Sequence, residues 1–199
     1  MADQDDFAGT VSSQYKPQGP SKTIEEYAQL DANDESLNKW KASLGITSTT
    51  TPIILDPSTP AKVLIDSISL HVAGRPDITV PLKDAAAIKK LKETPFIVKE
   101  GVVYSLTIRF RVQRDVVSGL KYLQVVKRSG IKLDSVEEML GSYGPAEQIY
   151  AKRLAEEEAP SGMLGRGRYD CRSRFVDDDG HVHLDFDWSV KIEKEWKDK

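Results

Sequence analysis

The sequence predicts an all-β fold, an immunoglobulin-like β-sandwich, preceded by a flexible N-terminal helical arm. Apolar and polar side chains alternate between residues 104 and 113, and the residues after Gly119 repeat this pattern. Two more alternating segments, 169–175 and 182–193, close the chain. Because successive side chains of a strand point to opposite faces, each segment has one apolar face. Half-buried strands of this kind need a second sheet to cover them, which favours a sandwich.

The segments between these strands complete the predicted domain. Residues 63–72 and 78–82 read as two earlier strands, and the alanine- and lysine-rich segment 84–93 predicts a short helix. Residues 135–140 predict a helical turn, and residues 146–167 are expected to be irregular. About seven strands at this spacing are typical of an immunoglobulin-like sandwich. The likeness is architectural, because the Cys…Trp…Cys signature of true immunoglobulin domains is absent.

The chain divides into a predicted arm, residues 1–55, and a predicted sandwich, residues 56–199. A threonine- and proline-rich linker, residues 46–60, lies at the boundary. The first 22 residues are polar and poor in large aliphatic side chains, a composition typical of disorder.

Two short helices are expected within the arm. Thr23 and Glu26 fit a capping box at the start of the first helix, and Asp31 or Asn33 can cap the second. Three apolar residues of the second helix share one face: Leu37, Trp40 and Leu44. Isolated helices this short are marginal in water, so they need a partner surface. That surface can belong to the same domain or to another protein.

Composition limits the classes of function. The 199 residues carry 28 basic and 31 acidic side chains, a net charge of −3, so no global field attracts nucleic acid or an anionic membrane. The single cysteine, Cys171, excludes an internal disulfide and favours a reducing compartment. No segment has the apolar length of a signal peptide or a membrane span. We expect a cytosolic protein without stable membrane insertion.

Metal binding and catalysis are not expected. His181 and His183 share a strand face, which the alternation predicts to be solvent-facing, and no third histidine or cysteine ligand is near in sequence. Residues 177–180 fit a turn rather than a ligand set. The glycines of residues 162–167 lack the spacing of a phosphate-binding loop, and no nucleophile elbow occurs. Cys171 faces inward, where burial makes a thiol inert.

One inward pattern leaves two interpretations open. The strand with Tyr169, Cys171 and Ser173 offers small side chains, whereas its neighbour offers Phe186 and Trp188. Small residues opposite large ones can pack as a solid core, or they can leave a cavity for a ligand.

Several blocks of the sequence resemble the Rho GDP-dissociation inhibitors. They are YKP at 15–17 with LDANDESLNKWKASLG, FIVKEGVVYSLTIRFRV with VSGLKY, GSYGP with EEAPSGMLGRGRY, SRFVDDDG, and DFDWSVKIEKEWKD. The resemblance covers Tyr15 to Asp198. It implies a regulator that acts by binding and is not an enzyme. Its expected partners are prenylated Rho- or Rac-type small GTPases, whose GDP release it slows and which it extracts from membranes into the cytosol.

The resemblance also implies which residues bind. In the arm, Tyr15 and Asp34 would bond the first switch region of the GTPase, and Leu37, Trp40 and Leu44 would anchor the contact. The expected prenyl-binding residues are Leu70, Phe96, Tyr104, Val116, Leu164, Cys171, Phe186 and Trp188. Those expected to face the basic tail before the lipid are Glu157, Glu158, Asp178 and Asp179. The chain would act as a monomer or a 1:1 complex without a cofactor of its own, since GDP and Mg²⁺ belong to the GTPase.

The sequence departs from the family pattern at four positions. Phe186 stands where many relatives have tryptophan, and Cys171 where they often have isoleucine, so the preferred lipid stays open. Pro95 and Arg168 replace serines that are regulatory in animal members. Two alternatives from other classes are a prenyl-lipid chaperone with broader cargo and a metal-dependent enzyme that uses His181 and His183.

Overall fold

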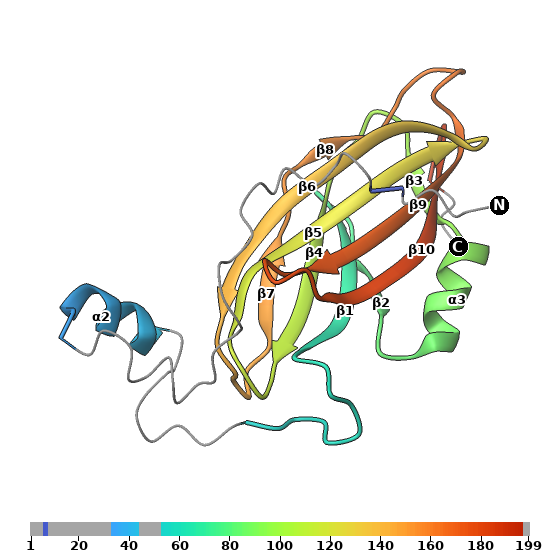
Figure 1. Cartoon of the computed structure of the whole chain (residues 1–199). Helices are drawn as coiled ribbons and strands as arrows, with labels where there is room; N and C mark the ends of the chain where they lie inside the picture. Colours follow the sequence, from blue (N-terminus) through green and yellow to red (C-terminus); the bar gives the residue numbers. More distant parts are fainter. Residues whose placement is uncertain (1–5, 8–32, 44–52, 197–199) are drawn as a thin grey trace.

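Two β-sheets face one another and form the body of the protein (Figure 1). The computed structural model describes residues 6–7, 33–43 and 53–196. The first sheet has the order β2-β1-β4-β7, with β8 also paired to β4, and comprises β1 (Val63–Val72), β2 (Ile78–Pro81), β4 (Val103–Val112), β7 (Tyr150–Arg153) and β8 (Glu157–Glu158). The second has the order β3-β10-β9-β5-β6 and comprises β3 (Phe96–Lys99), β5 (Val117–Arg128), β6 (Ile131–Tyr143), β9 (Gly167–Val176) and β10 (Val182–Glu193). The predicted all-β sandwich is confirmed.

The core lies between the sheets, where the alternating sequence places it. Ile108 and Phe110 of β4 and Leu120 of β5 are inaccessible to solvent. The rings of Tyr122 and Phe175, from β5 and β9, lie 5.3 Å apart between centroids. A large apolar side chain contributes about 1.5–3 kcal/mol when fully buried, so this inner layer dominates the stability of the domain.

The predicted helical insertion is α3, Ala85–Glu93, which packs on β10 (Figure 1). The Asp84 carboxylate caps it by accepting a hydrogen bond from the Ala86 amide at 2.9 Å. Leu91 is the buried residue of this helix. The Ser189 hydroxyl of β10 donates a hydrogen bond to the Lys92 carbonyl at 3.1 Å. This helix therefore covers part of the outer face of the second sheet.

The side chain of Gln113 fixes the entry of the chain into the sandwich. Its Oε1 accepts hydrogen bonds from the amides of Leu55 and Asp56, and its Nε2 donates to the Ala61 carbonyl at 2.7 Å. The Arg114 amide donates to the Ile53 carbonyl at 2.8 Å. Residues 53–61, which include much of the proposed linker, are thus held on the sandwich.

Two expectations from local sequence are wrong. Residues 135–140 do not form a helical turn but belong to β6, whose Glu137 and Val136 pair with Leu123 and Gln124 of β5. Long-range pairing satisfies the backbone there and overrides a weak helical signal. Residues 146–167 are not wholly irregular, since they contain β7 and β8, which pair with β4.

The start of β10 also differs from the simple alternation. The register shifts between Val182 and Leu184, and Val182 is 52 % exposed instead of facing the core. His183 is not solvent-facing as expected: its side chain is 6 % exposed, and its Nε2 lies 3.0 Å from the carboxylate of Asp177. A bulge of this kind re-aims side chains, which explains both differences.

The glycine at position 119 is required by a close approach. Gly119 has φ +59°, and a Cβ there would lie 1.8 Å from the carboxylate of Asp178. A side chain at position 119 would therefore strain the backbone and displace the Asp178 carboxylate in the turn between β9 and β10.

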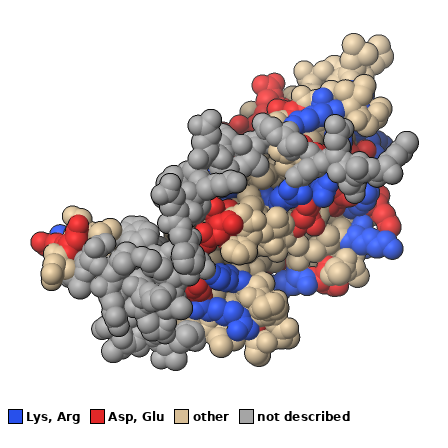
Figure 2. All heavy atoms as spheres, viewed as in Figure 1, with Lys and Arg blue, Asp and Glu red and all other residues tan. Residues whose placement is uncertain are grey.

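Charges are mixed on the face shown in Figure 2. Basic and acidic side chains are interleaved there and do not gather into a large patch of one sign. Among the residues that the structure describes, no helix is long and apolar enough to cross a membrane.

Candidate functional site

A cavity of about 180 Å³ lies between the two sheets. Strands β1, β3, β4, β5, β9 and β10 supply most of its wall, and residues of β6, β8 and one loop complete it. Its lining residues are Leu70, Phe96, Tyr104, Gln124, Val126, Leu133, Asp134, Glu157, Glu158, Pro160, Tyr169, Cys171, Trp188, Val190 and Ile192. The inward pattern of small residues opposite large ones thus leaves space for a ligand.

Aromatic and small side chains shape the inner wall of the cavity. Val126, Cys171 and Trp188 are direct neighbours across β5, β9 and β10. The Trp188 ring meets Phe96 edge to face, with centroids 5.7 Å apart. Because Cys171 stands between two larger residues, its short side chain leaves room beside the indole.

The polar groups near this wall bond to one another. The Tyr122 hydroxyl donates to Gln124 Oε1 at 2.6 Å and lies 2.8 Å from the Ser173 hydroxyl. Trp188 Nε1 donates to the same Ser173 oxygen at 2.8 Å. A buried polar group is costly only when it has no partner, so this network lets polar side chains border an apolar cavity.

Two ionisable side chains inside the site, Cys171 and Tyr104, stay neutral. Burial raises the pKa of the Cys171 thiol to about 12, and Asp170 and Glu157 add to the shift. Burial, followed by the nearby charge of Glu157, raises the pKa of the Tyr104 hydroxyl well above its usual range. A neutral thiol and phenol suit an apolar ligand and offer no nucleophile at neutral pH.

The open end of the cavity is acidic. Asp134 and Glu158 are exposed lining residues, and Glu157 accepts a hydrogen bond from the Tyr104 hydroxyl at 2.6 Å. An apolar interior with carboxylates at its opening can hold a lipid whose polar end carries positive charge.

Comparison with known proteins gives the family. A family model described as "RHO protein GDP dissociation inhibitor" matches residues 2–195. The chain belongs to this family. It is 45% identical over 180 residues to the Rho GDP-dissociation inhibitor of Schizosaccharomyces pombe, a match that covers 90% of this chain and 86% of the relative. The relative of Saccharomyces cerevisiae is 42% identical over 187 residues, with 92% of each chain covered. Human Rho GDP-dissociation inhibitor 1 is 42% identical, with 94% of this chain and 89% of the relative covered. The family is one of regulatory inhibitors and not of enzymes.

Five of the eight residues that the resemblance to Rho GDP-dissociation inhibitors assigns to the prenyl group line the cavity together: Leu70, Phe96, Tyr104, Cys171 and Trp188. Phe186 is buried beside them, two positions from Trp188 on β10, but does not line the cavity. Leu164 is 87 % exposed on a loop. Val116 is buried just before β5, about 30 Å along an extended strand from the cavity residue Val126. The structure does not bring these last two residues to the cavity.

The four acidic residues assigned to the basic tail separate into two pairs. Glu157 and Glu158 lie at the cavity. Asp178 and Asp179 lie in the turn between β9 and β10, where Asp178 pairs with Lys121 at 3.3 Å. Lys121 is five positions from Val126 along β5, so the second pair stands away from the opening.

Sequence reasoning left several lining residues unassigned. The alternation already placed Gln124, Val126, Tyr169, Val190 and Ile192 on inward faces, so their positions along the strands could have identified them. Leu133 and Asp134 lie in β6, just before the segment misassigned as a helical turn, and Pro160 lies in a loop, so the sequence carried no such signal for them.

The arm residues are described only in part. Helix α2, Glu35–Ser43, is capped by Asp34, whose Oδ1 accepts hydrogen bonds from the amides of Ser36 and Leu37. The expected cap at Asn33 is therefore wrong, since the helix begins after Asp34. Leu37 is 37 % exposed, and Trp40 lies within α2. Tyr15, Leu44, Asp31 and the helix expected at residues 23–30 lie outside the described residues.

One group of possible metal ligands occurs among the described residues. Atoms of Asp177, Asp179 and His181 lie within 4.8 Å of one another. The Asp177 carboxylate already accepts the His181 amide at 2.9 Å and is bonded to His183. Burial alone would raise the pKa of Asp177, but the hydrogen bonds from His183 and His181 lower it on balance. The group is thus accounted for as a hydrogen-bonded turn.

Proposed function

We propose that this chain binds prenylated Rho- or Rac-type small GTPases in their GDP form, slows GDP release, and withdraws them from membranes into the cytosol. The single observation that supports this most is the cavity between the sheets, with neutral walls and carboxylates at its opening. Family membership supplies the class of partner.

The lipid supplies most of the binding free energy. Burying a chain of roughly 20 carbons at about 0.8 kcal/mol per CH₂ yields on the order of 10 kcal/mol or more. A bilayer offers the same chain a similar gain, so contacts with the GTPase itself must tip the exchange. The arm is the proposed source of these contacts, through Tyr15, Asp34, Leu37, Trp40 and Leu44.

The cavity must widen to accept a whole geranylgeranyl chain. Its volume of about 180 Å³ equals roughly six times the liquid volume of one water molecule, about 30 Å³, whereas the lipid has about 20 carbons. The small Cys171 side chain leaves room in the wall, and Leu133 and Pro160 line the cavity as exposed residues. Glu157 and Glu158 then attract the basic tail that precedes the lipid.

The lipid half of the proposal is tested at Cys171. In Cys171→Trp the indole fills the space beside Trp188, so extraction of a geranylgeranylated GTPase from liposomes should fall by tenfold or more. Cys171→Ala keeps the space and should extract normally. Binding of an unprenylated GTPase and thermal stability are measured on the same preparations. Normal extraction by a stably folded Cys171→Trp protein would show that the lipid does not bind in this cavity.

The GTPase half is tested at Asp34, where two substitutions separate two roles. Asp34→Asn keeps a good helix cap but removes the charge, whereas Asp34→Ala removes both. If Asp34 bonds a switch region, both variants weaken inhibition of GDP release, by about 1.5–3 kcal/mol for a hydrogen bond to a charged group. A defect only in Asp34→Ala would show that the residue acts as a cap alone.

The alternative, a prenyl-lipid chaperone with broader cargo, is not favoured by the family. Such a chaperone would extract prenylated peptides and GTPases equally well and leave GDP release unchanged.

A further inference from the structure

The outer face of the second sheet carries an apolar cluster that the prenyl cavity does not explain. Leu123 and Val125 of β5 point away from the main core, yet they are 1 % and 0 % exposed. The ring of Phe7, from the start of the chain, covers them and is itself 1 % exposed. Val176 packs against the same cluster. A separate small core therefore joins the N-terminal segment to the outside of the sandwich.

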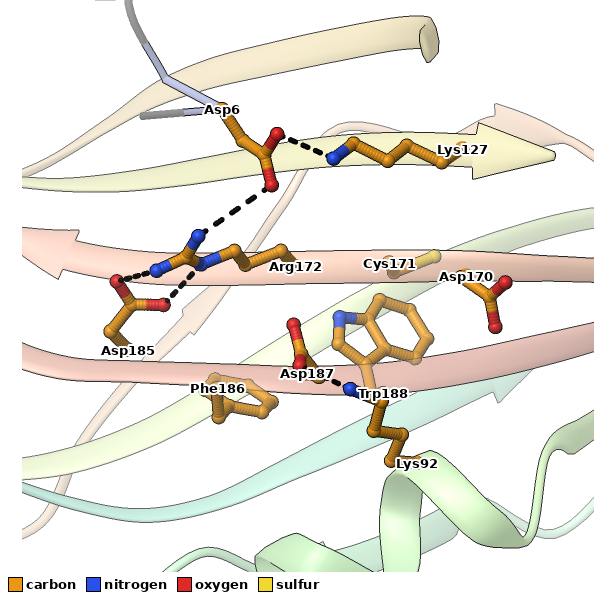
Figure 3. Close-up of a pocket in the computed structure, with 10 residues that line it drawn as sticks. All are labelled: Asp6, Lys92, Lys127, Asp170, Cys171, Arg172, Asp185, Phe186, Asp187 and Trp188. Carbon is orange, nitrogen blue, oxygen red and sulfur yellow. Dashed lines mark hydrogen bonds and ion pairs between the residues drawn. The ribbon is translucent and has the colours of Figure 1, made fainter. Parts of the chain in front are cut away.

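Charged side chains surround this cluster and fix the neighbouring residue, Asp6. Its carboxylate pairs with Lys127 of β5 and lies 3.5 Å from the guanidinium of Arg172 of β9 (Figure 3). Arg172 is oriented by two hydrogen bonds to Asp185, of 2.9 and 3.0 Å. The hydrogen bond from Lys127 lowers the pKa of Asp6, with Arg172 contributing as well. The two cations are thus positioned for a carboxylate at this point.

Two arginines, Arg172 and Arg174, also contact the Phe7 ring. The guanidinium carbon of Arg174 lies 4.4 Å from the centre of the Phe7 ring, and that of Arg172 lies 5.7 Å from it. Arg174 is held in place by Asp185, to which its Nε donates at 2.9 Å. Both distances are within the range of a cation–π interaction. The face therefore complements an acidic residue followed by an aromatic one.

We propose that this face, formed by Leu123, Val125, Val176, Lys127, Arg172 and Arg174, is a docking site for the chain's own N-terminal segment Asp6–Phe7. We call it the Phe7 site. The ligand chemistry is a short acidic-aromatic peptide, which the protein supplies in cis. The inference is independent of the proposed function, because it concerns the chain without any partner.

Docking at the Phe7 site changes the connectivity of the arm. The chain from Phe7 to Ile53 then begins and ends on the sandwich, so it is a closed loop and not a tail with one free end. The residues between Phe7 and Glu35 can span on the order of 90 Å when extended, so the tether does not prevent α2 from reaching a partner. An acidic-aromatic peptide from elsewhere would compete for the site and open this loop.

The test follows methyl NMR signals of Leu123, Val125 and Val176 in the full chain. Phe7→Ala removes the ring, so these signals should shift, and the ratio of docked to undocked chains should fall roughly ten- to a hundredfold. Asp6→Asn should lower the ratio less, because it keeps the ring and removes only the ion pairs with Lys127 and Arg172. Methyl signals of Val126 and Ile192 on the inner face report that the fold is intact.

A peptide of residues 1–12, added to the Phe7→Ala chain, provides the second measurement. A flexible tether gives an effective concentration in the millimolar range, so a site that is closed in cis must bind the peptide below that concentration. The peptide should restore the wild-type signals, and the same peptide with Phe7→Ala should not. Identical spectra of wild type and Phe7→Ala, equal effects of both peptides, or no binding at millimolar peptide would each overturn the proposal.

Discussion

The two faces of the sheet formed by β5, β9 and β10 carry different chemistry on the same strands. On the inner face, Tyr122 and Ser173 are buried and neutral, and their hydrogen bonds border a cavity. On the outer face, Arg172 and Arg174 hold Asp185 in a charged array. Side chains alternate between the two faces, so one strand contributes to both sites without any residue shared. Apolar residues within a charged outer face, such as Leu123 and Val125, therefore indicate that another segment packs over them, which here contains Phe7.

Among substitutions that distinguish the outer face from the inner face, we expect the largest loss of stability at Leu123. If Phe7 covers it, Leu123→Ala removes a buried side chain and should lower the free energy of unfolding by about 2 kcal/mol or more. In the Phe7→Ala background Leu123 is already uncovered, so the same change should cost less. Chemical denaturation of the four proteins gives the coupling, expected at about 0.5–3 kcal/mol. Strict additivity would mean that the two side chains do not touch.

A comparable change on the inner face should have a smaller effect. Ser173→Ala removes the oxygen that accepts from Trp188 Nε1 and leaves that indole N–H buried without its partner. The expected loss is about 1–3 kcal/mol, while Tyr122 keeps its bond to Gln124. Denaturation and the tryptophan fluorescence of Trp188 check this. Ser173→Thr, which keeps a hydroxyl, is the control, and equal losses in both variants would point to packing as the cause.

These residues show what the sequence could predict and what it could not. The alternation identified the inward faces of β5, β9 and β10, because burial between sheets leaves a period of two. It could not identify the cover over Leu123 and Val125, since Phe7 is more than a hundred residues away in sequence. It also misassigned β6, whose conformation depends on pairing with β5 and not on local propensity. The cavity residues Leu133 and Asp134 precede the misassigned segment 135–140, and they were missed because the sequence did not identify the first part of β6 as a strand.

The N-terminal cap of α3 allows a test of whether this helix and the Phe7 site, both on the outer face, are independent. Asp84→Ala removes the side chain that accepts the Ala86 amide, and should destabilise the protein by about 1 kcal/mol. Asp84→Ser retains a cap and should behave as wild type. Amide exchange within α3 should quicken in the alanine variant, whereas the methyl signals of Leu123 and Val125 stay unchanged. A shift of those signals would mean that α3 and the Phe7 site are coupled.

The smallest effect concerns pH. Lys127 and Arg172 face Asp6, Asp185 stands behind Arg172, and Lys92, Asp170 and Asp187 line the same groove. Because the pKa of Asp6 is lowered in the docked state, its contribution is complete above the usual aspartate pKa, about 3.9. That contribution is lost as the pH falls through the lowered value. The Leu123 methyl signal should therefore stay constant from neutral pH to about pH 4 and move toward the undocked position below it. Asp6→Asn should remove this dependence, and an unchanged transition in that variant would assign it to another group.

The most direct test of the account adds a geranylgeranylated peptide with a basic tail to the full chain and records the methyl spectrum. Inner-face signals of Val126, Val190 and Ile192 should shift on binding, while outer-face signals of Leu123 and Val125 keep their positions. Shifts confined to the outer face, or an inner face that does not respond at saturating peptide, would contradict the assignment of the lipid to the cavity between the sheets.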